Sequence, residues 1–515
     1  MITEKNTKKE NTERKAGVLL PIFSLPSAEG IGTLGKEAYK FVDWLKKTGV
    51  KIWQVLPLLP TNYGDSPYQS CASRALNFYF IDLDDLSREK LLEKSEYEEI
   101  DWGDFSRVDY GKLFEKKAEV LKLAFKRFDG TQESWKNFLK AGVYRDFALF
   151  MTLKNKFGYA PWTEWEEEYR LANAQALKKF EKENENEIEF WQFTQYVFLK
   201  QWQRLKEYAN ARGISIMGDM PIYVAYDSVE TWKYRKDLFM LGEDGNPSLR
   251  AGVPPDAFSE DGQLWGNPVY NWEKMKLDGY QWWKNRIEYE FTLFDIVRID
   301  HFRGFDRFYT VAEGFETAKL GEWLDGPKAK LFEDFKDKRI VAEDLGIIDD
   351  GVREMMKETG YPGMKVLSFG FNGDPDNEHK ASNHLKNVYA YTGTHDNAPI
   401  REMLEEFDDE KLENFKLEME LENERLGITF VYEESLEKDK EREIKNLCEN
   451  LMEQLFASKA DTAIVPMQDV LFLGKGSRVN SPSTVSGNWT YRFKKDDFSI
   501  KASKKLLSLV KKYNR

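Results

Sequence analysis

The stretch FDIVRID, residues 294–300, decides the predicted fold. Its apolar and β-branched residues do not alternate with polar ones, which is typical of a strand buried on both faces in a parallel sheet. The run ends in an acid, Asp300. Seven further runs share this character and cover residues 17–22, 51–58, 214–222, 339–344, 364–371, 387–396 and 462–469.

Amphipathic helical stretches separate most of these runs, for example KEAYKFVDWLKKTG at residues 36–49. Eight strands alternating with helices predict an α/β fold, a (β/α)8 TIM barrel. The alternation by itself also fits an open, doubly wound sheet.

Two gaps between strands are too long for ordinary barrel loops. The gap at about 59–213, after the second strand, is largely helical in pattern, and the gap at about 223–292, after the third, is rich in Trp, Gly and Pro. We interpret both as subdomains inserted at the C-terminal rim of the barrel, which gives large, mainly helical insertions. Residues 16–515 then form a single catalytic domain, and residues 1–15 a disordered tail.

Composition restricts the kind of partner. The chain has 515 residues, with 76 basic and 89 acidic ones and a net charge of −13, which argues against nucleic acid. No apolar run is long enough to span a membrane, and the N-terminus lacks the pattern of a signal peptide. Two cysteines far apart, Cys71 and Cys448, fit a reducing compartment, so we expect a cytoplasmic protein.

Acids sit at or just beyond the ends of four predicted strands: Asp219, Asp300, Glu343 and Asp396. Any one of them could simply cap the following helix. In a barrel, however, all four strand ends face one pocket. A pair of carboxylates across a pocket supplies the nucleophile and the acid/base of a retaining glycoside reaction.

Basic and imidazole side chains accompany these acids. Arg298 precedes Asp300 by two residues, so both side chains point to the same side of a strand, and the guanidinium should lower the pKa of the carboxyl. His395 precedes Asp396. His301 follows Asp300 and alternates away from it, so a purely structural role is equally compatible with its position.

A glycine-rich motif, GIGTLG at residues 30–35, matches the G-x-G-x-x-G pattern of dinucleotide-binding proteins. The segment FSLPSAE separates it from the first predicted strand, and the second strand does not end in an acid. Both features disfavour a dinucleotide site. We therefore expect no organic cofactor and no metal.

At these acids the sequence resembles the 4-α-glucanotransferases, called amylomaltases or disproportionating enzymes, of the α-amylase clan. The resemblance extends over nearly the whole chain, in segments that occur in the order of the family. The segments are FSLPSAEGIGTLG, DSPYQS, FTQYVFLKQW, GDMPIYVAYDSVETW, AGVPPDAFSEDGQLWGNPVYNW, VRIDHFRGF, AEDLG, YTGTHDN and QDVLFLGKGSRVNSP.

The resemblance implies roles for individual residues. It implies that Asp300 is the nucleophile, that Glu343 is the acid/base, and that Asp396 is a third carboxylate that binds sugar hydroxyls. The loop at residues 252–258 resembles one that covers the acceptor side. The implied substrate-binding residues are Ser66, Tyr68, Asp219, Trp265, Asn267, Arg298, His395 and Asn480.

The implied activity is transfer of α-1,4-glucan segments from a maltooligosaccharide, starch or glycogen chain to the 4-hydroxyl of another glucan. Two alternatives remain at this point: a hydrolase of the α-amylase type, and an inactive glucan-binding protein. The carboxylates themselves do not select a sugar over water as acceptor. The sequence says nothing of the oligomeric state.

Overall fold

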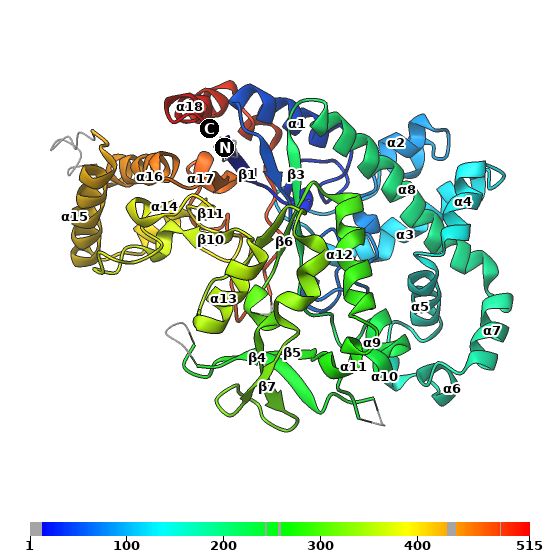
Figure 1. Cartoon of the computed structure of the whole chain (residues 1–515). Coiled ribbons are helices and arrows are strands. Elements are labelled where there is room, and N and C mark those ends of the chain that lie inside the picture. The colour runs from blue at the N-terminus through cyan, green and yellow to red at the C-terminus, as the bar shows by residue number, and fades with distance from the viewer. Residues whose placement is uncertain (1–12, 243–244, 256–258, 430–438, 485) are drawn as a thin grey trace, which may run out of the picture.

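The computed structural model describes residues 13–242, 245–255, 259–429, 439–484 and 486–515. Its centre is a sheet of eight parallel strands, in the order β10-β11-β12-β1-β2-β3-β6-β9, which curves into a nearly closed barrel (Figure 1). Each of these strands overlaps one of the eight predicted runs, so the predicted barrel is confirmed. The strands are β1 (Lys15–Leu19), β2 (Ile52–Gln54), β3 (Ser215–Met220), β6 (Ile296–Ile299), β9 (Ile340–Ala342), β10 (Gly363–Val366), β11 (Val388–Tyr391) and β12 (Thr462–Pro466).

The interior of the barrel is a cluster of buried side chains to which all eight strands contribute, and this excludes an open sheet. Since side chains alternate along a strand, residues two positions further along point inward above this apolar layer. Arg298 thus lies above Ile296, and Asp219 above Met217. The cluster comprises Leu19, Ile52, Met217, Ile296, Val341, Met364, Val366, Tyr391 and Ile464.

The sheet has a seam between β9 and β10, where regular pairing stops. The backbone nitrogen of Ala342 donates to the carbonyl of Pro362 (2.9 Å), and the backbone nitrogen of Met364 donates to Oδ1 of Asp344 (2.6 Å). These bonds join the two edge strands and leave the barrel almost closed.

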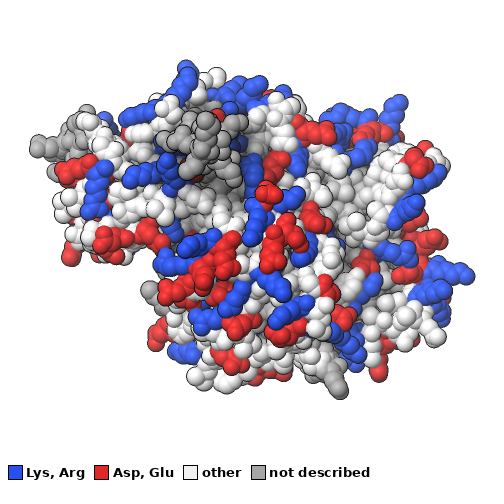
Figure 2. Space-filling view, viewed as in Figure 1, with Lys and Arg blue, Asp and Glu red and all other residues white. Residues whose placement is uncertain are grey.

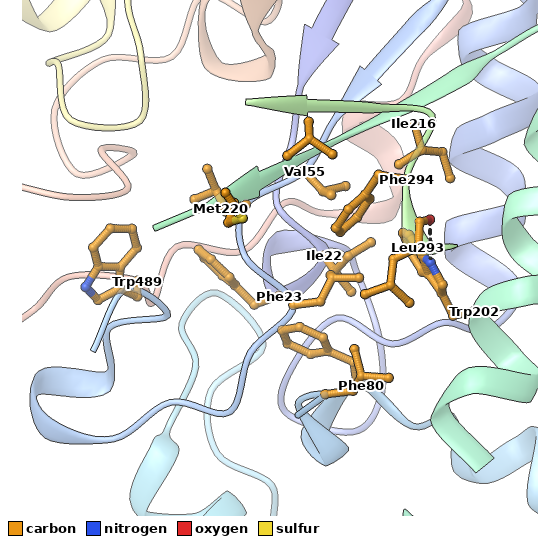
Figure 3. Packing of buried hydrophobic residues seen from close by; sticks show 14 of the residues in the cluster. Ile22, Phe23, Val55, Phe80, Trp202, Ile216, Met220, Leu293, Phe294 and Trp489 are labelled. Atoms are coloured by element: carbon orange, nitrogen blue, oxygen red, sulfur yellow. Dashed lines mark hydrogen bonds between the residues drawn. The ribbon is translucent and has the colours of Figure 1, made fainter. Parts of the chain in front are cut away.

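Helices cover the outside of the barrel. The ring of Phe294 lies against the Cα of Gly218 on β3, where a Cβ atom would come within 2.2 Å of it. Trp202 packs edge-on against this ring and donates to the carbonyl of Leu293 (3.0 Å), as Figure 3 shows. The covering helices are α1 (Lys36–Thr48), α8 (Glu185–Asn210), α12 (Gln281–Leu293), α13 (Asp350–Thr359), α16 (Lys440–Ala457) and α18 (Ile500–Lys512).

The glycine-rich motif ends at the start of α1 and serves packing. A Cβ on Gly35 would lie 1.7 Å from a carboxylate oxygen of Asp82, so only glycine fits there. Asp82 in turn accepts a hydrogen bond from Thr33 within the motif (2.8 Å). The motif is thus a close contact between two loops.

The segment between β2 and β3 folds mainly into helices, which Figure 1 shows to one side of the barrel. The last of them, α8, returns the chain to β3. The preceding helices are α2 (Leu83–Arg88), α3 (Tyr110–Arg127), α4 (Glu133–Ala141), α5 (Arg145–Lys156), α6 (Glu167–Arg170) and α7 (Ala174–Glu183).

The segment after β3 contains short helices and two strands of a second sheet that the sequence analysis did not predict. This four-stranded antiparallel sheet, in the order β5-β4-β7-β8, takes its other two strands from the stretch after β6. Its strands are β4 (Leu249–Val253), β5 (Gln263–Pro268), β7 (Arg307–Ala312) and β8 (Glu322–Asp325). The short helices are α9 (Val229–Lys233), α10 (Arg235–Leu238) and α11 (Trp272–Lys276).

A third excursion, between β11 and β12, is helical, with α14 (Ile400–Glu405) and α15 (Asp409–Leu426) preceding α16. The short helix α17 (Met467–Val470) follows β12. Basic and acidic side chains are intermixed over the face in Figure 2. No helix within the described parts of the chain has the length and apolarity to cross a membrane.

Most of the predicted tail, residues 1–12, lies outside the described residues. Arg14, at its end, donates to the carbonyls of Phe456 and Tyr513 (2.9 and 3.0 Å).

Candidate active site

A cavity of about 460 Å³ lies at the carboxyl ends of the barrel strands, between the helical insertion and the small antiparallel sheet. It brings together all but one of the predicted site residues, and the exception, Asp219, lies buried beneath it. The predicted residues that line the cavity are Ser66, Tyr68, Trp265, Asn267, Arg298, Asp300, Glu343, His395, Asp396 and Asn480.

Arg298 links the buried layer to the cavity. One guanidinium nitrogen binds both carboxylate oxygens of Asp219 (2.7 and 2.8 Å), and the other lies 3.0 Å from Oδ1 of Asp300. Burial disfavours its charge, but the carboxylates of Asp219 and Asp300 outweigh burial and hold its pKa well above the ordinary value. Tyr68 completes the network by donating its hydroxyl to Asp219 (2.9 Å).

Asp300 follows directly after β6, and its backbone nitrogen donates to the carbonyl of Met220 at the end of β3 (3.0 Å). Burial raises the pKa of its carboxyl to about 6, and the guanidinium of Arg298 opposes this rise. Arg298 therefore lowers the pKa of Asp300 as expected, but desolvation exceeds the ion pair, so that the net pKa lies above its ordinary value.

Glu343 follows β9, and backbone donors hold both of its carboxyl oxygens. The backbone nitrogen of His301 donates to Oε2 (2.7 Å), and that of Leu345 to Oε1 (2.8 Å). His301 reaches this position with a left-handed backbone, φ 50°, which is unusual for a residue with a side chain. Burial, and then the negative charge of Asp300, raise the pKa of Glu343 to about 7.

Asp396 lies in the loop after β11, and the chain beyond β12 holds it from the side. Asn480 donates to Oδ1 (2.6 Å), and Arg478 donates to the backbone carbonyl of Asp396 (2.7 Å). Nε2 of His395 lies 3.4 Å from Oδ2. The side chain remains 42% exposed, so its carboxylate is open to a ligand in the cavity.

Aromatic and amide side chains form the walls. The ring of Tyr68 stacks on that of His395, with centroids 5.3 Å apart. Trp265, on β5, contacts the ring of His301 edge-on at 4.9 Å. Asn267 exchanges a hydrogen bond with Gln69 (3.1 Å). Of the predicted acceptor-side loop, residues 253 and 254 line the cavity and residues 256–258 lie outside the described part of the chain.

The lining also contains residues that were not predicted as site residues, among them His301, Trp323 and Trp489. His301 faces the cavity because the chain has already left β6, and strand alternation does not apply to it. Trp323, on β8, stacks on the guanidinium of Arg303 at 4.0 Å. Trp489 lies beside Tyr68 at 5.7 Å and is seen in Figure 3 at the edge of the core.

This arrangement defines a class of protein. Asp300 is paired with a buried arginine, Glu343 has a pKa near neutrality, and the carboxylate of Asp396 is open to the cavity. Carboxyl groups with these properties in the cleft of a barrel are those that an enzyme needs to break glycosidic bonds through two carboxylates. The aromatic walls suit flat sugar faces.

Comparisons with known proteins agree with this class. The sequence model of the 4-alpha-glucanotransferase family, glycoside hydrolase family 77, matches residues 20–497. A 4-alpha-glucanotransferase from Clostridium butyricum is 41% identical over 508 residues, which cover 96% of this chain and 99% of the relative. The chain therefore belongs to the 4-α-glucanotransferase family, whose function is transglycosylation of α-1,4-glucans.

Solved structures are similar as well. The amylomaltase from Streptococcus agalactiae in complex with acarbose superposes with a TM-score of 0.90 at 39% identity, over 98% of this chain and 100% of that one. The amylomaltase from Corynebacterium glutamicum, 18% identical with a TM-score of 0.73 over 98% of this chain and 75% of that one, shares the fold.

Proposed function

We propose that this protein transfers α-1,4-glucan segments between maltooligosaccharides by a retaining, two-step mechanism in the described cavity. The observation that carries the proposal is the pairing of Asp300, with a pKa of about 6, and Glu343, with a pKa of about 7, in one cleft. Near neutral pH the first is largely ionised and the second is substantially protonated, as a nucleophile and a general acid require.

In the first step a carboxylate oxygen of Asp300 attacks the anomeric carbon of the donor. The bond between this carbon and the glycosidic oxygen breaks, and Glu343 gives its proton to that oxygen, so the shorter glucan leaves with a free 4-hydroxyl. Arg298, 3.0 Å from Asp300, favours the ionised carboxylate before the attack.

In the second step the roles of Glu343 reverse. Its carboxylate takes the proton from the 4-hydroxyl of an acceptor glucan, and the acceptor oxygen attacks the anomeric carbon and releases Asp300. Both oxygens of Glu343 can keep their backbone donors in either protonation state, since a carboxylic acid retains free lone pairs on each oxygen. The orientation of the group therefore persists through the cycle.

Asp396, held by Asn480 and flanked by His395, is proposed to bind the hydroxyls of the sugar that is distorted at the reacting centre. Tyr68, Trp265 and Asn267 are proposed to bind neighbouring sugars. The acarbose complex of the Streptococcus agalactiae relative supports α-glucans as substrates. Aromatic acceptor sites that favour sugar over water in the cleft would direct the intermediate to transfer.

The proposal is tested by incubating the protein with maltotriose alone and separating the products by chromatography. Transfer yields a ladder of longer and shorter oligomers together with glucose, at constant total reducing ends. A hydrolase of the α-amylase type would instead raise the number of reducing ends and form no longer oligomers, which would contradict the proposal.

A further inference from the structure

The position of Asp396 depends on the loop at residues 393–399, and the two ends of this loop meet at a single buried carboxylate. Oδ2 of Asp469 accepts a hydrogen bond from the hydroxyl of Thr392 (2.6 Å), directly after β11. Oδ1 of Asp469 accepts one from the backbone nitrogen of Ile400 (2.8 Å), where α14 begins. Asp469 lies on α17, in the turn that follows β12.

Within the loop, short-range bonds set the shape. Oδ1 of Asn397 accepts from the backbone nitrogen and from the hydroxyl of Thr394 (2.8 and 2.9 Å), and the carbonyl of His395 accepts from the backbone nitrogen of Asn480 (3.1 Å). These contacts fix how the loop is folded. The bonds to Asp469 fix where its two ends lie relative to the barrel.

The residue before Asp469 holds the second support of Asp396. Nε2 of Gln468 donates to the carbonyl of Ser477 (3.1 Å), next to Arg478, whose guanidinium binds the carbonyl of Asp396. Two consecutive side chains on α17 thus hold the two loops that meet at Asp396.

Asp469 is only 4% exposed and lies behind the cavity wall. Burying a carboxylate is costly, and an apolar residue of similar size would avoid that cost. A carboxylate does offer two short, charge-assisted hydrogen bonds of fixed geometry from one rigid group. Its placement therefore favours accurate location of the loop over stability.

We infer that Asp469 is a positioning residue that places Asp396 for the reaction by tying both ends of its loop to the end of β12. The inference rests on the role proposed above for Asp396.

The test is a double-mutant cycle between Asp469→Leu and Asp396→Asn. The readout is kcat/KM with maltosyl fluoride as donor and maltose as acceptor, so that slow variants remain measurable. In the wild-type background Asp469→Leu should lower kcat/KM by about 10–10²-fold, mainly through kcat, as misplacement by about 1 Å does. In the Asp396→Asn background the same substitution should cost less than about twofold, because the group that it misplaces no longer acts.

An equal loss in both backgrounds would show a general structural role and overturn the inference. Wild-type activity of Asp396→Asn alone would instead overturn the proposed role of Asp396, and the two failures are therefore distinguishable.

A milder variant serves if Asp469→Leu does not fold. Thr392→Val removes one of the two hydrogen bonds to Asp469 at nearly constant volume. It should lower kcat/KM in the wild-type background but have little effect on kcat/KM in the Asp396→Asn background. Asp469→Asn can keep both links, by accepting from Ile400 and donating to Thr392, and should stay within about threefold of the wild type. Loss of activity in Asp469→Asn as large as in Asp469→Leu would contradict positioning through these links.

The chain offers a matched control on α15. Glu422, 1% exposed, also accepts from one backbone nitrogen and one hydroxyl, both of Ser382 (3.1 and 3.0 Å). Glu422→Leu should lower the melting temperature but leave kcat/KM of the folded protein unchanged. If Glu422→Leu lowers kcat/KM as much as Asp469→Leu does, removal of a buried carboxylate is enough to explain the loss and the inference fails.

Discussion

Replacing Glu343 by Gln should remove one limb of the pH profile and leave the other. In the wild type, kcat/KM should fall about tenfold per unit as pH drops below 6, because Asp300 becomes protonated, and about tenfold per unit as pH rises above 7, because Glu343 loses its proton. A glutamine keeps the size of the side chain but has no proton to give. The rate with maltotriose should therefore drop by at least about 10²-fold.

The shape of the remaining profile follows from the order of the two pKa values. Glu343 is already neutral in the pH range where Asp300 titrates, so its replacement should leave the acid limb near pH 6. The limb near pH 7 should disappear. Maltosyl fluoride, whose leaving group needs no proton, should glycosylate Asp300 in the variant far faster than maltotriose does.

The assay measures kcat/KM with maltotriose and with maltosyl fluoride as a function of pH. The pH range is roughly 4.5 to 9, which spans both limbs. Glu290→Gln is the matched control. Burial raises the pKa of Glu290, on α12, to about 8, but this side chain does not line the cavity. The Glu290→Gln variant should retain the limb near pH 7. If Glu343→Gln keeps that limb, or Glu290→Gln loses it, the assignment of the general acid is refuted.

Three further outcomes are expected. Asp300→Asn should bind glucans but fail to form the glycosyl-enzyme, and a fluorinated maltosyl donor should label Asp300 in the wild type; labelling of another carboxylate, seen by peptide mass spectrometry, would contradict its role. Arg298→Met should raise the pKa of Asp300 and move the acid limb up by about 1–3 pH units, whereas Arg298→Lys should move it less; an unmoved limb in Arg298→Met would show that the ion pair does not tune the nucleophile. Tyr68→Ala and Trp265→Ala should each cost about 1–2 kcal/mol of acceptor binding and raise the ratio of glucose to longer oligomers. Tyr68→Phe separates loss of the ring from loss of its hydrogen bond to Asp219, and an unchanged product ratio in both alanine variants would refute sugar stacking.

The barrel could be predicted because strands buried on both faces have continuous apolar runs. The small antiparallel sheet could not be predicted in this way. Its strands are partly exposed, so the runs are interrupted by polar residues. Its central pair joins β4 to β7, with Ala251 opposite Thr310 and the barrel strand β6 between them in the sequence. Such pairing depends on the completed barrel and has no local signal.

That Asp300, Glu343 and Asp396 meet in one cavity could be predicted because the ends of parallel strands converge. The orientation of His301 could not be predicted. It depends on the left-handed backbone of His301 itself, two residues beyond Ile299, the last residue of β6. Trp489 also has a positive φ, 62°, in a loop whose local sequence, SGNWTY, indicates only a turn. The balance between desolvation and the ion pair at Asp300 depends on burial, which the sequence does not specify.

The neighbours of β1 affect the order in which the protein can assemble during synthesis. β1 lies between β2 and β12, and about 440 residues separate it from β12 along the chain. At roughly 5–20 residues per second, the ribosome needs on the order of 20–90 s to make that stretch. Throughout this time one edge of β1 lacks its partner, and the nascent chain presents an open strand edge to other chains. Within the described residues, no other pair of hydrogen-bonded strands in the barrel is so far apart in the sequence, so this edge waits longest for its partner during synthesis.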